Sequence, residues 1–126
     1  MHTLESEARQ LAGLLELAQA RARIAGSRLA FSADSQGYAF WLRDDSGVWR
    51  AIENDDPLKG RIVDERLSIV SMTVGGIAVA LGQRVAISGH DPVPLSIALH
   101  GPGNRAIVQS GVFDGRMDVR IVRGDK

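Results

Sequence analysis

The first part of the chain is marked by apolar residues that recur every three or four positions. Between residues 4 and 25 the steps are four, three, four, three, four and three, which traces one continuous stripe along an α-helix of about 3.6 residues per turn. Leu14, Leu17 and Ile24 widen the stripe on one flank, as expected for a helix that packs on a core. The sequence therefore predicts one long amphipathic helix over residues 4–25. Its stripe is formed by Leu4, Ala8, Leu11, Leu15, Ala18, Ala22 and Ala25.

Both ends of this helix carry suitable capping chemistry. Thr3 is a typical N-cap residue, and Glu5 and Glu7 place negative charge in the first turn, where the helix dipole favours it. Arg23 lies in the last turn, and Gly26 follows as a residue that commonly ends helices. The caps and the periodicity agree on the same bounds.

From Arg28 onward the hydrophobic period changes from 3.6 to 2, which is typical of β-strands. Turn-forming residues at 34–37 and 44–47 separate three short strands, so we predict an antiparallel meander over residues 28–52. Large aromatic side chains are concentrated in this meander, and we expect them to bury the helix stripe. They are Tyr38, Phe40, Trp41 and Trp49.

The rest of the chain reads as further short strands joined by loops. Residues 53–58 are polar and interrupted by proline, which predicts a surface loop. Strands are expected at 61–63, 67–73, 77–81, 85–87, 95–100, 105–109 and 116–122. The fold class is therefore α+β, with one domain over residues 1–126: the helix, then a β-rich body over about residues 28–123.

Composition removes several classes of function. Fifteen basic and fifteen acidic residues cancel, so the chain does not attract nucleic acid or an anionic membrane by bulk charge. The absence of cysteine excludes disulfides, thiolate catalysis and cysteine-ligated zinc. No run of about 18 apolar residues is present, so the sequence as given predicts no bilayer-spanning helix.

Three segments carry weak signals of chemistry. Ser88, His90 and Asp91 could be imagined as a nucleophile, a base and its orienting group, but the segment 88–92 is more typical of a turn. Glu53, Asn54, Asp55 and Asp56 could offer oxygens to calcium, although the loop lacks the spacing of an EF-hand. Gly75 and Gly76 lack the context of a phosphate loop and favour a bulge or hairpin tip. We therefore predict a protein that is not an enzyme and has no metal or cofactor.

Several short motifs, taken in order, resemble one family. The run from Leu14 to Leu29, with Gly26 after the helix, is similar to the helix and first strand of GspH/FimT pseudopilins. Later segments resemble the same family in the same order. They are Gly37-Tyr38-Ala39-Phe40, Trp49-Arg50, Asp56-Pro57-Leu58, Gly103-Asn104-Arg105 and Gly115-Arg116.

This resemblance implies the pseudopilin (type IV pilin-like) fold and a structural role. Members of the family are minor pseudopilins of type II secretion systems, at or near the tip of a periplasmic pseudopilus that helps push folded exoproteins through the outer-membrane secretin. The implied partners are other minor and major pseudopilins, with the secretin periplasmic domains and exoproteins as further candidates. The stripe residues 4–22 would then form the helix packing and assembly face.

One feature of the family does not appear in this sequence. Family members begin with a basic leader, a methylated peptidase site and a membrane-spanning first half of the helix. We therefore expect the chain to be the periplasmic part of a longer, single-pass inner-membrane protein of a Gram-negative bacterium. The functional glutamate of the family lies in the part that is missing, so Glu5 is not assigned that role.

An alternative follows from relatives of the FimT type, which include DNA-binding minor pilins. The last predicted strand alternates charged and apolar residues, and its basic side chains could gather with others in one patch. Acidic residues at 114, 118 and 125 interrupt that patch. The candidate patch consists of Arg105, Arg116, Arg120 and Arg123.

Overall fold

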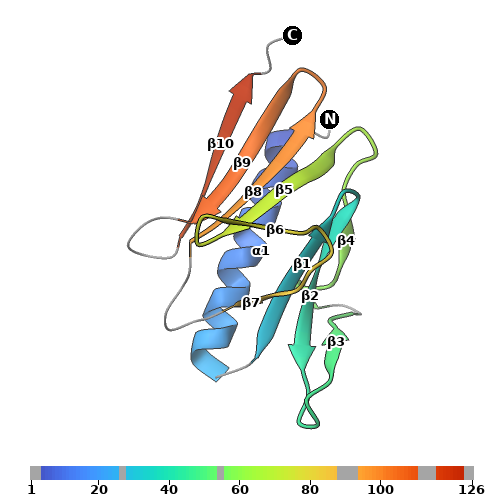
Figure 1. Cartoon of the computed structure of the whole chain (residues 1–126), viewed down its shortest axis with the longest axis vertical. Helices are drawn as coiled ribbons and strands as arrows, with labels where there is room; N and C mark the ends of the chain where they lie inside the picture. The colour runs from blue at the N-terminus through green and yellow to red at the C-terminus, as the bar shows by residue number, and fades with distance from the viewer. Residues whose placement is uncertain (1–3, 26–27, 54–55, 88–93, 111–115, 124–126) are drawn as a thin grey trace.

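A computed structural model of the chain describes residues 4–25, 28–53, 56–87, 94–110 and 116–123. Helix α1 spans Leu4–Ala25, the bounds predicted from the sequence. Ten strands follow it in the described part of the chain (Figure 1). They are β1 (Leu29–Asp34), β2 (Gly37–Arg43), β3 (Trp49–Ala51), β4 (Arg61–Ile62), β5 (Ser68–Val74), β6 (Ile77–Val79), β7 (Val85–Ile87), β8 (Leu95–Gly101), β9 (Asn104–Ser110) and β10 (Met117–Arg123).

The strands form two antiparallel sheets. The N-terminal sheet has the order β3-β2-β1-β7, with β4 also paired to β2, and the C-terminal sheet has the order β10-β9-β8-β5-β6. In Figure 1 the C-terminal sheet crosses the first half of α1, and the N-terminal sheet lies alongside its second half. The predicted α+β class, with one helix packed on antiparallel sheets, is confirmed.

The predicted meander β1–β2–β3 is present, with Phe31 opposite Phe40 in the register. Its first turn is held by Asp34, whose Oδ1 accepts hydrogen bonds from the backbone N–H groups of Gln36 and Gly37. Strand β1 is buried on both faces from Leu29 to Ala33, because neighbouring side chains also cover its outward face. One of them is Trp41, whose indole Nε1 donates to Ser32 Oγ at 2.9 Å.

The core joins the helix stripe to residues of both sheets, and here one expectation needs correction. Phe31, Tyr38 and Phe40 belong to the core, whereas Trp41 and Trp49 are only half-buried and lie outside it. Successive residues of a strand face opposite sides of a sheet, so Trp41 points away from the face that Phe40 presents. The backbone of α1 lies closest to β9 and β10, not to the aromatic meander.

Two connecting segments complete the fold. The loop after β3 was predicted to lie on the surface, but Leu58 in it is fully buried and belongs to the core. Gly75 and Gly76 have positive φ angles of 60° and 81° and form the tip of the β5–β6 hairpin, a backbone conformation that favours glycine. Within the described residues, no helix is long and apolar enough to cross a membrane.

Candidate assembly surfaces

The predicted packing stripe of α1 is buried inside this chain. All six predicted positions have exposed fractions between 0% and 6%. The stripe is therefore covered by the chain's own core and is not available as an exposed surface. The six are Leu4, Ala8, Leu11, Leu15, Ala18 and Ala22.

The uncovered side of α1 carries charged residues and one large apolar residue. Glu5 and Arg9 form an exposed ion pair one turn apart, with Nη2 and Oε2 separated by 2.7 Å. Ile24 was placed on the flank of the stripe by sequence, but it is 85% exposed. It follows the last buried stripe residue, Ala22, at the end of the helix, so neither sheet covers it. Ile24 is the largest apolar side chain that the described part of α1 offers to a partner.

Glu16 links the helix to the last strand. Its Oε2 accepts a hydrogen bond of 2.8 Å from the backbone N–H of Met117, the first residue of β10. Because the backbone N–H of an edge strand has no strand partner on its open side, a carboxylate is a suitable acceptor there. The contact fixes β10 against the middle of α1.

The loop that was considered for calcium is engaged by the helix. Arg21 Nη1 donates to Asp56 Oδ2 at 2.9 Å, and Asp56 Oδ1 accepts from the Leu58 N–H. Both hydrogen bonds lower the pKa of Asp56, and the one from Arg21 has the larger effect. Asn54 and Asp55 lie outside the described residues, and the described part of the chain contains no group of three or more potential metal ligands.

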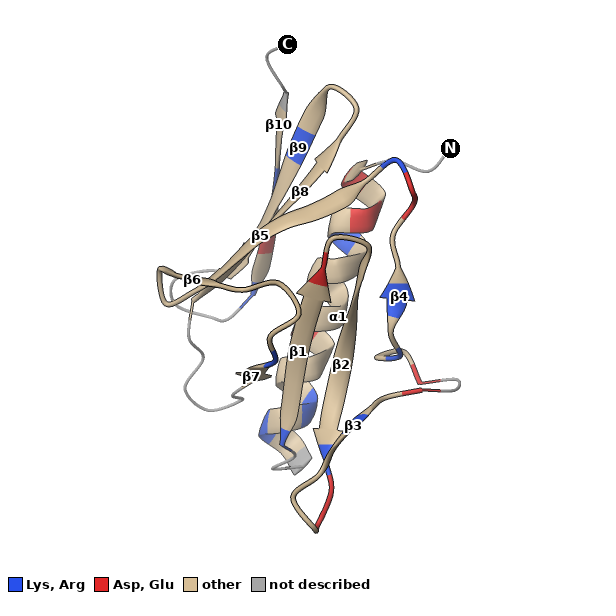
Figure 2. Cartoon of the chain, turned by 45° about the vertical axis from the view of Figure 1, so that its right-hand side comes forward, with Lys and Arg blue, Asp and Glu red and all other residues tan. Residues whose placement is uncertain are grey.

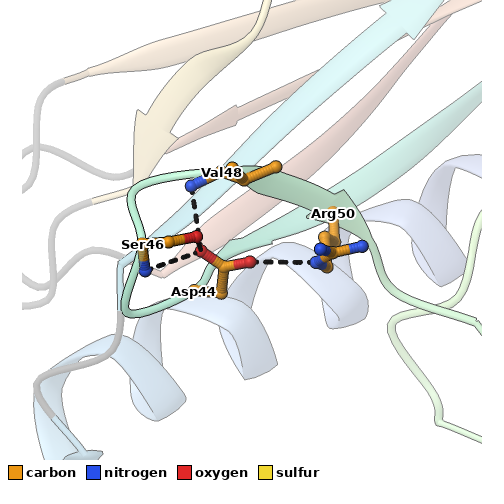
Figure 3. A network of polar contacts seen from close by, with 4 residues as sticks. All are labelled: Asp44, Ser46, Val48 and Arg50. Atoms are coloured by element: carbon orange, nitrogen blue, oxygen red, sulfur yellow. Dashed lines mark hydrogen bonds and ion pairs between the residues drawn. The ribbon is translucent and has the colours of Figure 1, made fainter.

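The β2–β3 turn is organised around one carboxylate (Figure 3). Asp44 accepts hydrogen bonds from the Ser46 hydroxyl, from the backbone N–H groups of Ser46 and Val48, and from Arg50 Nε. These hydrogen bonds hold the pKa of Asp44 well below its usual range. The Ser46 hydroxyl has the largest effect, and the Val48 N–H and Arg50 come next. The network is exposed and determines the shape of the turn.

A polar group lies inside the aromatic cluster. Tyr38 is 4% exposed, and its hydroxyl has no hydrogen-bond partner among the described residues. Burial, followed by the charge of Glu7 on α1, raises the pKa of Tyr38 to about 12, against a smaller opposite effect of Arg61. At neutral pH the phenol is therefore protonated, and it serves as a packing group.

The candidate basic patch is only partly assembled. His100 pairs with Arg105 across β8 and β9, and Arg120 pairs with Ile107 across β9 and β10. Because Ala106 and Val108 face the core, Arg105 and Arg120 share the outward face. Asp118 lies on that face too, two residues from Arg120. Arg116 is exposed just before β10, and the side chain of Arg123 lies outside the description.

The three candidate catalytic residues lie outside the described part of the chain. Ser88, His90 and Asp91 all fall in the segment 88–93, which lies outside the described residues. Of the histidines in the sequence, His100 is described, and it is exposed at the end of β8.

One surface that the sequence did not lead us to predict is formed by a stretch without charged residues. Residues 68–83 contain no Lys, Arg, Asp or Glu, and in Figure 2 strands β5 and β6 carry neither blue nor red. Ile77 in β6 is 73% exposed, and Leu81 is 40% exposed. The length of the charge-free run was a signal that could have identified this surface.

One long helix packed on two antiparallel sheets, with the helix first in the chain, defines the pseudopilin class of fold. No family model matches the sequence, and no curated protein sequence matches it. Solved structures do match, and the likeness concerns the fold.

Two of them are structures of EpsH, a minor pseudopilin from the type II secretion system of Vibrio cholerae. One has a TM-score of 0.71 and 16% sequence identity, and the match covers 97% of this chain and 98% of that one. The other has a TM-score of 0.73 at 16% identity, covering 98% and 96%. The chain therefore has the fold of EpsH over nearly its whole length.

Proposed function

We propose that this chain is a minor pseudopilin of a type II secretion system and acts as a structural subunit. The observation that carries the proposal is the likeness of the fold to that of EpsH over nearly the whole chain. No catalytic step is assigned to it. Its function is to bind other pseudopilins through its surface.

In this proposal the domain lies in the periplasm, at or near the tip of a pseudopilus, and belongs to a protein anchored in the inner membrane. Its partners are the other minor and major pseudopilins, and the filament helps to move folded exoproteins through the secretin. The helix stripe is occupied by the domain's own core. Neighbours therefore contact the uncovered side of α1, with Ile24 as its apolar anchor.

The test is binding to the periplasmic domains of the other pseudopilins of the same secretion system. We expect a complex by gel filtration and calorimetry, and Ile24→Arg should weaken it roughly tenfold because it places a charge in an apolar contact. Ile62→Arg is the matched control, since Ile62 is 84% exposed but lies on β4, away from the helix. No complex with any of these domains would reject the proposal.

DNA binding is a second candidate function, favoured by the outward face shared by Arg105 and Arg120. Phosphate contacts of this kind give affinity that falls steeply with salt. Asp118 on the same face opposes it. A titration with duplex DNA at low ionic strength decides the matter: binding lost in Arg105→Ala and Arg120→Ala supports it, and no binding rejects it.

A further inference from the structure

Strand β10 ends the C-terminal sheet with one open edge. Among the described residues, its only strand neighbour is β9. In an antiparallel pair, backbone groups alternate between facing the neighbour and facing away. The N–H of Met117 faces away from β9, because it donates to Glu16. Val119 and Ile121 have the same parity, so their N–H and C=O groups also face the open edge.

The side chains of this strand are arranged as two different faces. Val119 pairs with the buried Val108 and lies on the core face with Met117 and Ile121. Asp118 and Arg120 are both exposed on the outward face, one on each side of Val119. In Figure 2, β10 correspondingly carries both charge colours. Opposite charges two residues apart on an edge strand form a self-complementary pattern.

We propose that β10 pairs with β10 of a second copy of this chain, antiparallel and centred on Val119. In this register Asp118 lies opposite Arg120 of the partner copy, and Arg120 lies opposite its Asp118. Such opposite-charge cross-strand pairs stabilise a sheet, whereas like charges in the same places destabilise it. The core-facing side chains also match, since Met117 lies opposite Ile121 of the other copy. The proposal does not depend on the proposed secretion role.

Other registers are less favourable for stated reasons. A pairing centred on Met117 loses both hydrogen bonds of its central pair, because the Met117 N–H of each copy already donates to Glu16. In the register centred on Val119 the Met117 N–H lies at the end of the ladder and stays bonded to Glu16, and the N–H groups of Val119 and Ile121 form the pairing. A pairing centred on Ile121 places Arg120 opposite Val122, so the charge of Arg120 has no acidic partner there. Because a strand shifted by one residue would exchange its faces, the charges together with the core-facing residues select the register centred on Val119.

Charge exchange tests the pairing directly. Sedimentation over a wide range of concentrations should show a monomer–dimer equilibrium for the wild-type chain. Asp118→Arg and Arg120→Asp should each weaken dimerisation about tenfold, because each creates like-charge pairs. The double variant should restore it, and the two single variants should associate when mixed, since their charges are then complementary. Thermal unfolding of each variant checks that the monomer is folded.

The register is measured separately. The chain has no cysteine, so Val122→Cys carries a single spin label on the outward face. A dimer centred on Val119 separates the two labels by six residues of strand, roughly 20 Å at ~3.3 Å per residue. A wild-type chain that stays monomeric overturns the proposal. So does a dimer unaffected by the charge exchange, or one with a label separation far from that value.

Discussion

The two sheets bury the same helix by different means. The N-terminal sheet fills its side of the core with rings: the centroids of Phe31 and Phe40 are 5.1 Å apart, and those of Phe31 and Tyr38 are 6.0 Å apart. The C-terminal sheet approaches α1 more closely, and its buried side chains are aliphatic, such as Ile97 and Leu99, with Ala106 fully buried among them. The core is therefore completed by aromatic rings on one side and by aliphatic side chains with a close backbone approach on the other.

This difference predicts opposite sensitivities to volume. Removing atoms should be most harmful in the aromatic sheet, where a ring fills the space between backbones. Adding atoms should be most harmful where β9 meets the helix, because the two backbones approach closely there and Ala106 of β9 is fully buried. Gly101 shows the same crowding near the start of α1, since a Cβ on it would lie 2.8 Å from Leu67 Cδ2 and 3.6 Å from Leu4 Cβ.

The largest effect is expected for Phe40→Ala. Phe40 is 0% exposed, and truncating a buried phenylalanine lowers the free energy of unfolding by about 3–5 kcal/mol. Leu42→Ala is the control on the same strand, because Leu42 is 44% exposed and should lose less than about 1 kcal/mol. Urea unfolding measures both. Equal losses would show that the rings do not fill the core as described.

A smaller loss is expected for Ala106→Leu. The added atoms have no space between β9 and α1, and overpacking of this kind costs about 1–3 kcal/mol. Ala78→Leu makes the same change at an exposed position of β6 and should stay within about 0.5 kcal/mol. If both variants unfold at the same urea concentration as the wild type, the close approach of helix and sheet is wrong.

Much of the fold could be predicted because its signals are local. The helix has a complete stripe and charges of the right sign at its ends, and its bounds were obtained without error. The β2 and β3 strands are separated by Asp44 and Gly47, which are typical turn residues. The end of β3 is less marked, and the predicted strand 48–52 is longer than the observed Trp49–Ala51.

The contacts between residues far apart in the chain could not be predicted from the sequence. Periodicity says that Tyr38, Phe40 and Trp41 lie in a strand, but the assembled sheet decides that Trp41 faces outward and covers Ser32. Likewise, the alternation of β10 predicts two faces, but not that β10 is an edge whose Met117 N–H is held by Glu16. Separations of about a hundred residues leave no local signal. The assembly surface depends on these long-range contacts.

The turns of the two sheets differ in whether they contain an ionisable group. The β2–β3 turn combines the Asp44 carboxylate with Gly47, whose φ is 88°, whereas the β8–β9 turn depends on Gly103, with a φ of 80°. Because hydrogen bonds lower the pKa of Asp44 below the ordinary 3.8, its stabilisation is present above that value and is lost as the pH falls through the folded-state pKa. The melting temperature of Asp44→Asn should therefore depend less on acid than that of the wild type.

The control for this measurement is Asp45→Asn, the exposed neighbour in the same turn, which should keep the wild-type acid dependence. Because the Asp44 network is exposed, the change in melting temperature should be small. An identical acid dependence for Asp44→Asn and the wild type would mean that the carboxylate does not hold the turn in solution.

The smallest effect at neutral pH is expected for Tyr38→Phe. The Tyr38 hydroxyl is buried and has no hydrogen-bond partner among the described residues, so its removal should change the free energy of unfolding by less than about 1 kcal/mol. At high pH the difference becomes visible. A pKa raised from 10.0 to about 12 means that the folded state holds the proton more tightly than the unfolded state.

The stabilising effect of Tyr38 is therefore complete below pH 10.0 and is lost as the pH rises through about 12. Tyr38 is the only tyrosine of the chain, so the tyrosinate absorbance of the folded protein reports its titration alone. We expect a midpoint near 12 and a weaker alkaline loss of stability in Tyr38→Phe. A midpoint near the ordinary value would mean that the ring is hydrated, and the tightly packed aromatic side of the comparison would then fail.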